Sequence, residues 1–221
     1  MKFTTTKQAN KFVNVLVYGR SGIGKTRLCA TAPDPLIISS ESGLLSIADE
    51  DIPVIEIKDL EDLQDAYEYC KSKKAKKFKT ICLDSITDLA ETILSDIKEN
   101  SRDGRQAYGE LNEEVAKMIR KFRDLPKNTY FIAKVETYEN DIGVTCYRPA
   151  MPGRTLTRDL PYFFDEVFAL RAVGEDDDEK ILLQTKASAT WDAKDRSGKL
   201  EQGEKPNLTK IFNKIKGDKK K

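Results

Sequence analysis

The chain has 221 residues and a formal net charge of +1, from 38 lysines and arginines against 37 aspartates and glutamates. This length suits one α/β domain with a sizeable core, and the balanced charge does not by itself indicate nucleic-acid or membrane binding. The absence of histidine excludes Ser-His-Asp and Cys-His catalysis and a Cys/His zinc site, so any general base must be aspartate, glutamate or lysine.

The cysteines and the apolar runs bear on the compartment. Cys29, Cys70, Cys82 and Cys146 are not spaced as CxxC, so we expect buried thiols in a reducing environment. No apolar run approaches membrane-spanning length, and the polar N-terminus MKFTTTKQAN lacks a signal-peptide core. We therefore expect a cytoplasmic protein without a membrane partner.

The first 135 residues alternate predicted strands and helices. Apolar runs predict the strands, and apolar residues at helical spacing predict most of the helices. In chain order these are strand 12–18, helix 26–31, strands 36–40 and 53–57, helix 59–72, strand 78–84, helices 86–97 and 111–122, and strand 129–135. Such alternation predicts an α/β fold with a mainly parallel sheet and helices on both faces.

The pattern changes after residue 135. VTCYRPAMPG (144–153), DEVFALRAV (165–173) and KILLQTK (180–186) predict strands joined by short turns, with GEDDDE (174–179) as an exposed hairpin turn. We expect these strands to be antiparallel and to extend the same sheet. The expected organisation is a flexible N-terminus at 1–11, the main domain at 12–205, and a short helix with a basic tail at 206–221.

Residues 15–30, VLVYGRSGIGKTRLCA, contain a complete phosphate-binding loop. Gly19-Arg20-Ser21-Gly22-Ile23-Gly24-Lys25-Thr26 matches G-x-x-x-x-G-K-[ST], between a predicted strand and a predicted helix. Glycines let backbone N–H groups turn toward phosphates, Lys25 reaches the outer phosphates, and Thr26 offers its hydroxyl to Mg²⁺. We expect these residues and Arg27 to bind ATP with Mg²⁺.

Two carboxylates complete the predicted catalytic set. Asp84 ends the strand in KTICLDS, where such enzymes hold the Mg²⁺ shell; the alternative is that Asp84 caps the next helix. Glu41 follows strand 36–40, and because strand ends on the carboxyl side of an α/β sheet face the ligand crevice, it is the candidate base that activates water. The alternative for Glu41 is an exposed residue that opens a glycine-containing loop.

These residues resemble the core of the RecA-type ATPases. In that group the catalytic glutamate lies on the strand after the P-loop helix, as Glu41 does in IISSESG, and the metal-side aspartate is commonly followed by serine, as in ICLDSITDL. PAMPGRTLTRDLPYFFDEVFAL (149–170) and AKDRSGKL (193–200) further resemble the phage-encoded Sak-type single-strand annealing ATPases. The resemblance covers about residues 12–200 and implies a RecA-like fold in a phage protein of the host cytoplasm.

The resemblance also implies partners and further site residues. It implies a homo-oligomer, as a ring or a filament, on single-stranded DNA, with a single-strand binding protein as a further partner. Lys194 and Arg196 would stabilise the transferred phosphoryl from the adjoining subunit, or be ordinary surface charge. Lys134 stands where such proteins place a γ-phosphate sensor, although the phage annealing ATPases often have histidine there.

DNA-binding loops are implied at 99–108 and 136–143. The first contains Arg102, Arg105 and Tyr108, which offer phosphate partners and a stacking face. The second is acidic and repels a phosphate backbone. The stretch KSKKAKKFK (71–79) contains six lysines, and we interpret it and the lysine-rich tail as solubilising surface, with nucleic-acid contact as the alternative.

Three functions remain open from the sequence. The leading hypothesis is an oligomeric recombination ATPase on single-stranded DNA. A P-loop phosphotransferase would need a substrate pocket or lid with clustered arginines near the phosphates, and a nucleotide-switched adaptor would act through a partner protein without binding DNA.

Overall fold

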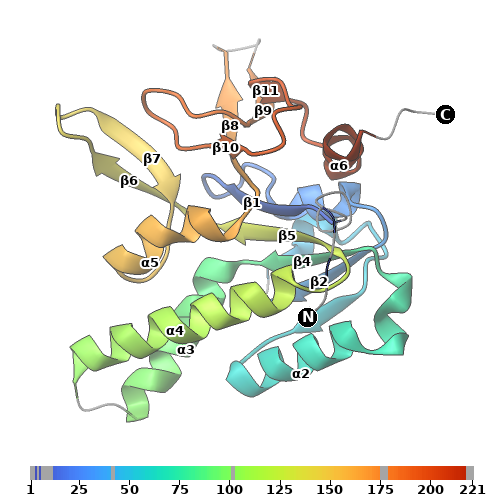
Figure 1. Ribbon diagram of the computed structural model, residues 1–221, viewed down its shortest axis with the longest axis vertical. Helices are drawn as coiled ribbons and strands as arrows, with labels where there is room; N and C mark the ends of the chain where they lie inside the picture. The colour runs from blue at the N-terminus through green and yellow to red at the C-terminus, as the bar shows by residue number, and fades with distance from the viewer. Residues whose placement is uncertain are drawn as a thin grey trace.

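A mixed α/β sheet forms the centre of the computed structural model (Figure 1). The structure describes residues 3, 5, 12–40, 43–100, 103–174 and 179–217, without the side chain of residue 100. Within these residues, nine strands join the sheet in the order β11-β9-β8-β1-β5-β4-β2-β3, with β10 paired to β8. Their bounds are β1 Asn14–Tyr18, β2 Pro35–Ser39, β3 Val54–Glu56, β4 Thr80–Asp84, β5 Asn128–Ala133, β8 Glu166–Val173, β9 Lys180–Gln184, β10 Lys194–Asp195 and β11 Gly203–Glu204.

The sheet is mainly parallel, as predicted. β3, β2, β4, β5, β1 and β8 all run in one direction, and β9, β10 and β11 are antiparallel to their neighbours. The expected antiparallel extension of the sheet is confirmed where β9 and β10 pair with β8, but β8 itself lies parallel to β1, with Val15 opposite Glu166. The chain reaches β8 through α5 (Arg154–Asp159) and η4 (Leu160–Phe163), and such a crossover returns a strand in the parallel sense.

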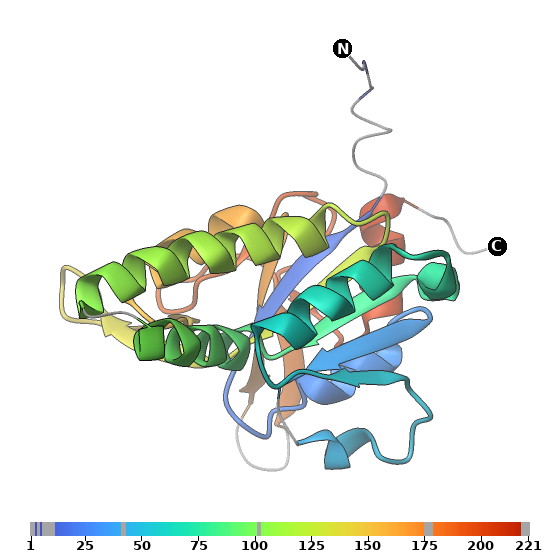
Figure 2. The same ribbon diagram turned by 90° about the horizontal axis from the view of Figure 1, so that it is seen from below.

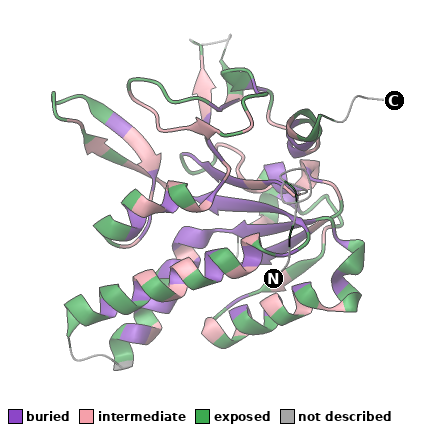
Figure 3. Ribbon diagram, viewed as in Figure 1, coloured by how far each residue is buried: buried purple, intermediate pink, exposed green. Residues whose placement is uncertain are grey.

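Both faces of the central strands are buried (Figure 3). The sheet separates two hydrophobic cores, and alternate residues of β1 pack into each. Leu16 and Tyr18 belong to the first core, and Val15 and Val17 belong to the second. The first core packs α2 (Leu60–Lys71), α3 (Ile86–Asn100) and α4 (Gly104–Arg123), of which α3 and α4 lie side by side in both views (Figures 1 and 2). The second packs the short helices η1 (Thr26–Thr31) and η2 (Leu44–Ile47) and helix α6 (Leu208–Lys216). Burial on both faces explains the continuous apolar runs of the sequence.

A separate hairpin projects from the main sheet (Figure 1). β6 (Val135–Glu139) and β7 (Thr145–Pro149) pair only with each other among the described strands, so the expectation that 144–153 extends the main sheet is wrong. The predicted loop 136–143 is instead largely β6 and its turn, in which Gly143 has φ +78°. The hairpin is tied to β1 because the Tyr18 hydroxyl donates to the Tyr147 carbonyl at 3.1 Å.

None of the helices in the described part of the chain is long and apolar enough to span a membrane.

The described cysteines, Cys29, Cys70, Cys82 and Cys146, are all buried free thiols.

A buried carboxyl at the start of β8 holds the loop after β10. Glu166 is 1% exposed, its Oε1 accepts from the Ser197 amide at 3.2 Å, and Asp195 lies opposite it in the strand pairing. Burial, and next the negative charge of Asp195, raise the pKa of Glu166 from 4.5 to about 8. The Glu166 carboxyl therefore keeps its proton in the folded chain at neutral pH.

This carboxyl makes stability depend on pH. Between pH 4.5 and about 8, the folded chain holds a proton at Glu166 that the unfolded chain releases, so the free energy of unfolding falls as pH rises, by up to about 1.4 kcal/mol per pH unit. Asp195, whose pKa is lowered by hydrogen bonds from Ser197, Leu200 and Gly198 that outweigh its burial, contributes only in more acidic solution. Glu166→Gln should flatten this dependence in urea unfolding across that range, and parallel wild-type and variant curves would contradict it.

Candidate active site

Three glycines shape the phosphate-binding loop between β1 and η1. Gly22 and Gly24 have φ of +77° and +101°, and a Cβ built on either would meet nothing within 4 Å. These two positions therefore need glycine for their backbone conformation. At Gly19 a Cβ would lie 2.5 Å from the carbonyl oxygen of Leu170, so this glycine lets the loop pack against β8.

The helix after the loop is short. The predicted helix 26–31 is confirmed as the six-residue 3-10 helix η1, which ends where Ala32 becomes extended ahead of Pro33. The Leu28 amide approaches both the Gly24 and the Lys25 carbonyl, at 3.1 and 3.2 Å. Arg27 is exposed and donates to the Ser46 carbonyl of η2 at 3.3 Å.

Lys25 folds back over the loop. Its Nζ donates to the carbonyls of Gly19 at 2.8 Å and Arg20 at 2.9 Å. The Lys25 backbone is fixed from β5, because the buried hydroxyl of Tyr130 donates to the Lys25 carbonyl at 2.9 Å. Sequence analysis did not predict this role for Tyr130; the available signal was a polar aromatic residue in an otherwise apolar predicted strand.

Thr26 and Asp84 meet across the sheet. The Thr26 hydroxyl donates to Asp84 Oδ2 at 2.6 Å, and Asp84 is 4% exposed. Burial raises the pKa of Asp84, and the Thr26 hydrogen bond and the Lys25 charge oppose that rise. The helix cap proposed as the alternative for Asp84 is supplied by Ser85, whose hydroxyl accepts from the Asp88 amide at 3.2 Å.

The oxygens beside this pair suit a magnesium ion. The Ser40 amide donates to the Asp84 carbonyl at 3.2 Å, and the buried Ser40 hydroxyl makes no hydrogen bond within the described residues. Mg²⁺ takes hard oxygen ligands, often one or two carboxylates together with substrate phosphates and water. The Thr26 hydroxyl and the Asp84 carboxylate fit that donor set, and a cation there would favour the charged form of a carboxylate that burial disfavours.

Lys134 lies between β5 and β6, at the carboxyl edge of the sheet. Its Nζ pairs with Asp88 at 2.5 Å and with Glu91 at 3.5 Å, and the hydrogen bond that Nζ donates to Asp88 is the main cause of its raised pKa. Its amide donates to the buried Thr87 hydroxyl at 3.0 Å. Asp88 also accepts a short hydrogen bond from the Ser85 hydroxyl, so α3 links Lys134 to the end of β4.

Two of the predicted cations lie away from the loop. Lys194 donates to the carbonyls of Pro161 and Phe164, both at 2.6 Å, and Arg196 pairs with Asp165 at 2.9 Å. Both therefore lie near the start of β8, whereas the phosphate loop follows the end of the parallel strand β1. Within one chain, the structure does not bring them together with Lys25.

The other predicted residues fall into two groups. Glu41 and Arg102 lie outside the described residues. Arg105 and Tyr108 are described, but they lie in α4 and not in a loop as expected, because that helix begins at Gly104 with Asp103 as its cap. Both are exposed, and Lys98 lies over the Tyr108 ring at 5.3 Å.

Comparison with known proteins identifies the family. The profile of the AAA domain matches residues 11–197. Among solved structures, a KaiC-like protein from the hyperthermophilic archaeon Pyrococcus horikoshii OT3 is 14% identical, with a TM-score of 0.49 and 77% of each chain covered. No sequence among the curated proteins matches. The AAA match spans most of the chain and includes the phosphate loop, Thr26 and Asp84, so the chain belongs to the AAA domain family of P-loop ATPases.

Proposed function

We propose that this P-loop ATPase is an oligomeric recombination protein of the Sak type, which hydrolyses ATP and anneals single-stranded DNA. The observation that supports hydrolysis best is the 2.6 Å contact between the Thr26 hydroxyl and the buried Asp84 carboxylate beside the phosphate loop. The DNA substrate and the phage context rest on the sequence resemblance at residues 149–170 and 193–200.

Different groups of the site bind the phosphates and the metal ion of ATP. Mg²⁺, when bound, offsets the charge that develops on the outer phosphates. The Lys25 ammonium leaves its two loop carbonyls and binds phosphate oxygens. The backbone amides of the loop bind the other phosphate oxygens. Thr26 and Asp84 hold the metal side of the site.

Glu41 is the proposed base that orients and deprotonates the attacking water. The preceding residue, Ser40, donates its amide to the backbone carbonyl of Asp84, which supports a place for Glu41 near the metal side of the site. Lys134 is the proposed γ-phosphate sensor. Its side chain is 46% exposed, so its ammonium group is accessible to a phosphate that would replace Asp88 as its partner.

Arg196 and Lys194 are the proposed contributors to the site of an adjoining subunit. Arg196 is the better placed, because its side chain is 59% exposed and an exposed pair with Asp165 is readily exchanged. Lys194 would have to leave two carbonyls. The proposed DNA contacts are Arg105 and Tyr108 in the first turns of α4, together with Arg102, and a base would replace Lys98 on the Tyr108 ring.

ATP turnover should rise on addition of single-stranded DNA, and the particle should be larger than one chain. Phosphate release with and without oligothymidylate, together with light scattering, measures both. DNA-independent turnover in a monomer that phosphorylates an added metabolite would contradict the proposal and favour the phosphotransferase.

Removing the Thr26 hydroxyl should weaken the metal site. Thr26→Val keeps the shape but loses the contact to Asp84, and should lower Mg²⁺ affinity by about 10- to 100-fold, as losses of metal-site partners do. Thr26→Ser restores a hydroxyl and is the matched control. Magnesium titrations of ATP turnover measure the effect; equal Mg²⁺ dependence in the two variants would exclude Thr26 from the metal site.

Replacing Glu41 by glutamine should separate binding from hydrolysis. An amide cannot accept the proton of water, so turnover should fall by about 100-fold or more, while a fluorescent ATP analogue binds as before. Glu50→Gln, which alters an exposed acid beyond η2, is the control. Unchanged turnover in Glu41→Gln would remove Glu41 as the base.

A further inference from the structure

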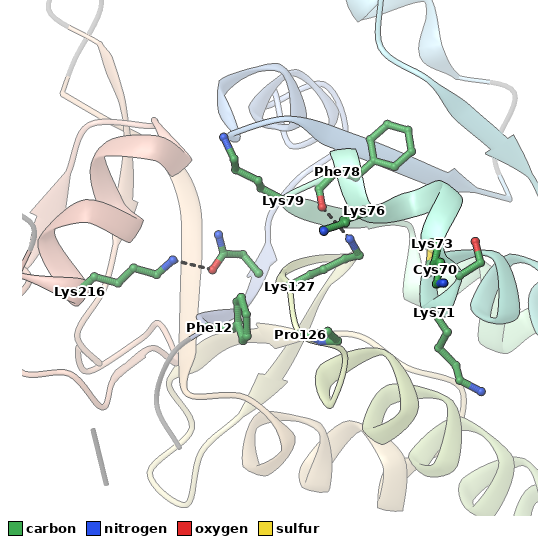
Figure 4. A pocket seen from close by; sticks show the side chains of 12 residues that line it. Phe12, Cys70, Lys71, Lys73, Lys76, Phe78, Lys79, Pro126, Lys127 and Lys216 are labelled. Atoms are coloured by element: carbon green, nitrogen blue, oxygen red, sulfur yellow. Dashed lines mark hydrogen bonds between the residues drawn. The ribbon is translucent and has the colours of Figure 1, made fainter. Parts of the chain in front are cut away.

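A lysine-lined cavity of about 430 Å³ lies at the edge of the sheet opposite the phosphate loop. Its walls come from the end of α2, the 3-10 helix η3 (Lys73–Lys77), the starts of β4 and β5, and the end of α6 (Figure 4). β4 and β5 begin at this cavity, and β4 ends at Asp84 in the active site. The two sites are therefore separated by the length of a strand.

The cavity is strongly positive. No aspartate or glutamate lines it among the described residues. Its cationic side chains are Lys71, Lys73, Lys76, Lys79, Lys127 and Lys216. Such a concentration of one charge attracts anions, and low-dielectric walls strengthen the attraction.

Several of these lysines are available to a ligand. The side chains of Lys73 and Lys76 are exposed and form no ion pair or hydrogen bond with any described residue. Lys71 pairs with Glu68 at 2.9 Å and Lys79 with Asp34 at 2.7 Å, and their side chains are 47% and 70% exposed. Ion pairs this exposed contribute little stability, so a multivalent anion can compete for these lysines.

Polar hydrogens are also available within the cavity. Lys127 is buried, and its Nζ donates to the carbonyls of Ala75 and Phe78, both at 2.7 Å. Figure 4 shows the bond to Phe78. An ammonium group has three donors, so one is left over among the described contacts. The neighbouring Ser72 hydroxyl is buried and makes no hydrogen bond within the described part of the chain. An unsatisfied buried hydroxyl beside six lysines suits an anion with several oxygens.

The distribution of charge favours a strand of phosphates over a compact anion. Lys74 and Lys77 continue the positive surface along η3 outside the cavity, so the cations outnumber those that one small anion could contact. Phe12 adds an aromatic side chain to the wall (Figure 4), as single-strand binding sites do. Lysines also act as point charges without the planar fork of arginine, which suits contact to a backbone and not to base edges.

We propose that this cavity binds the phosphate backbone of single-stranded nucleic acid. The inference rests on the proposed function for the choice of nucleic acid, and it adds a site that is distinct from the α3–α4 turn. The cavity and the α3–α4 turn lie at opposite ends of helix α4, which has 20 residues. At the rise of an α-helix, this length corresponds to about 30 Å. Each site can therefore be tested without altering the other.

Charge reversal of the two exposed lysines tests the cavity. The full chain, without ATP, is titrated into fluorescein-labelled oligothymidylate and followed by fluorescence anisotropy over a series of salt concentrations. Lys73→Glu/Lys76→Glu should weaken binding by about tenfold or more and reduce the slope of log K against log salt by about 1.4, from two lost contacts of about 0.7 each. Lys180→Glu/Lys186→Glu changes exposed lysines at the start of β9 and two residues beyond its end, carries the same charge change, and should bind within about twofold of wild type.

The remaining outcomes separate this inference from the proposed function. Equal binding by the two double variants would overturn the cavity site, and loss of binding only in Arg105→Ala would place the DNA at the α3–α4 turn instead. If the wild type binds no oligonucleotide, the DNA function itself fails. Lysine-dependent binding of inorganic polyphosphate with no binding of oligothymidylate would overturn the assignment to nucleic acid. Thermal unfolding of each variant confirms that a loss of binding does not arise from a loss of fold.

Discussion

The active site depends on a contact between two strands that are not neighbours. β5 lies between β1 and β4, so at about 4.8 Å per strand the ends of β1 and β4 are about 10 Å apart. The phosphate loop has to cross the end of β5 before the Thr26 hydroxyl can reach Asp84 at 2.6 Å. Tyr130 of β5 supports the crossing by donating its hydroxyl to the Lys25 carbonyl. Any shift in the register of β5 would therefore disturb the loop and the carboxylate together.

The parts of this site that the sequence predicted are those determined locally. The loop glycines, Lys25 and Thr26 lie close together in the chain. The strand before Asp84 is buried on both faces, so it appears in the sequence as a continuous apolar segment. Tyr130 acts across 105 positions of sequence, and nothing near it in the chain indicates its partner. The parallel pairing of β8 with β1 was missed for the same reason, since a strand pattern does not specify whether its neighbour is parallel.

The hairpin and the lysine stretch show a second limit of prediction from sequence. Residues 129–135 are predicted as one strand, but β5 ends at Ala133 and β6 begins at Val135 in another sheet. The stretch 71–79 was interpreted as solubilising surface because its charge alone is uninformative. Its cavity exists only because residues 126–128 and Lys216 fold against it, and such long-range packing leaves no signature in local composition.

The two edges of the sheet differ in the helix ends that lie there, and therefore in how each can bind an anion. In a parallel α/β sheet, helices begin at the carboxyl edge of the strands and end at the amino edge, so the amino edge collects the negative ends of helix dipoles. Here α2 ends at Lys71 and α6 ends at Lys216, and both lysines line the cavity. Lysines at helix C-termini offset that dipole, so some of this positive charge stabilises the fold itself. A phosphate at the amino edge must then be bound by ammonium groups, whereas at the carboxyl edge the backbone amides of the glycine loop bind phosphate together with a single lysine, Lys25. This difference explains why one edge of the molecule has a glycine-rich loop with one lysine and the other has six lysines.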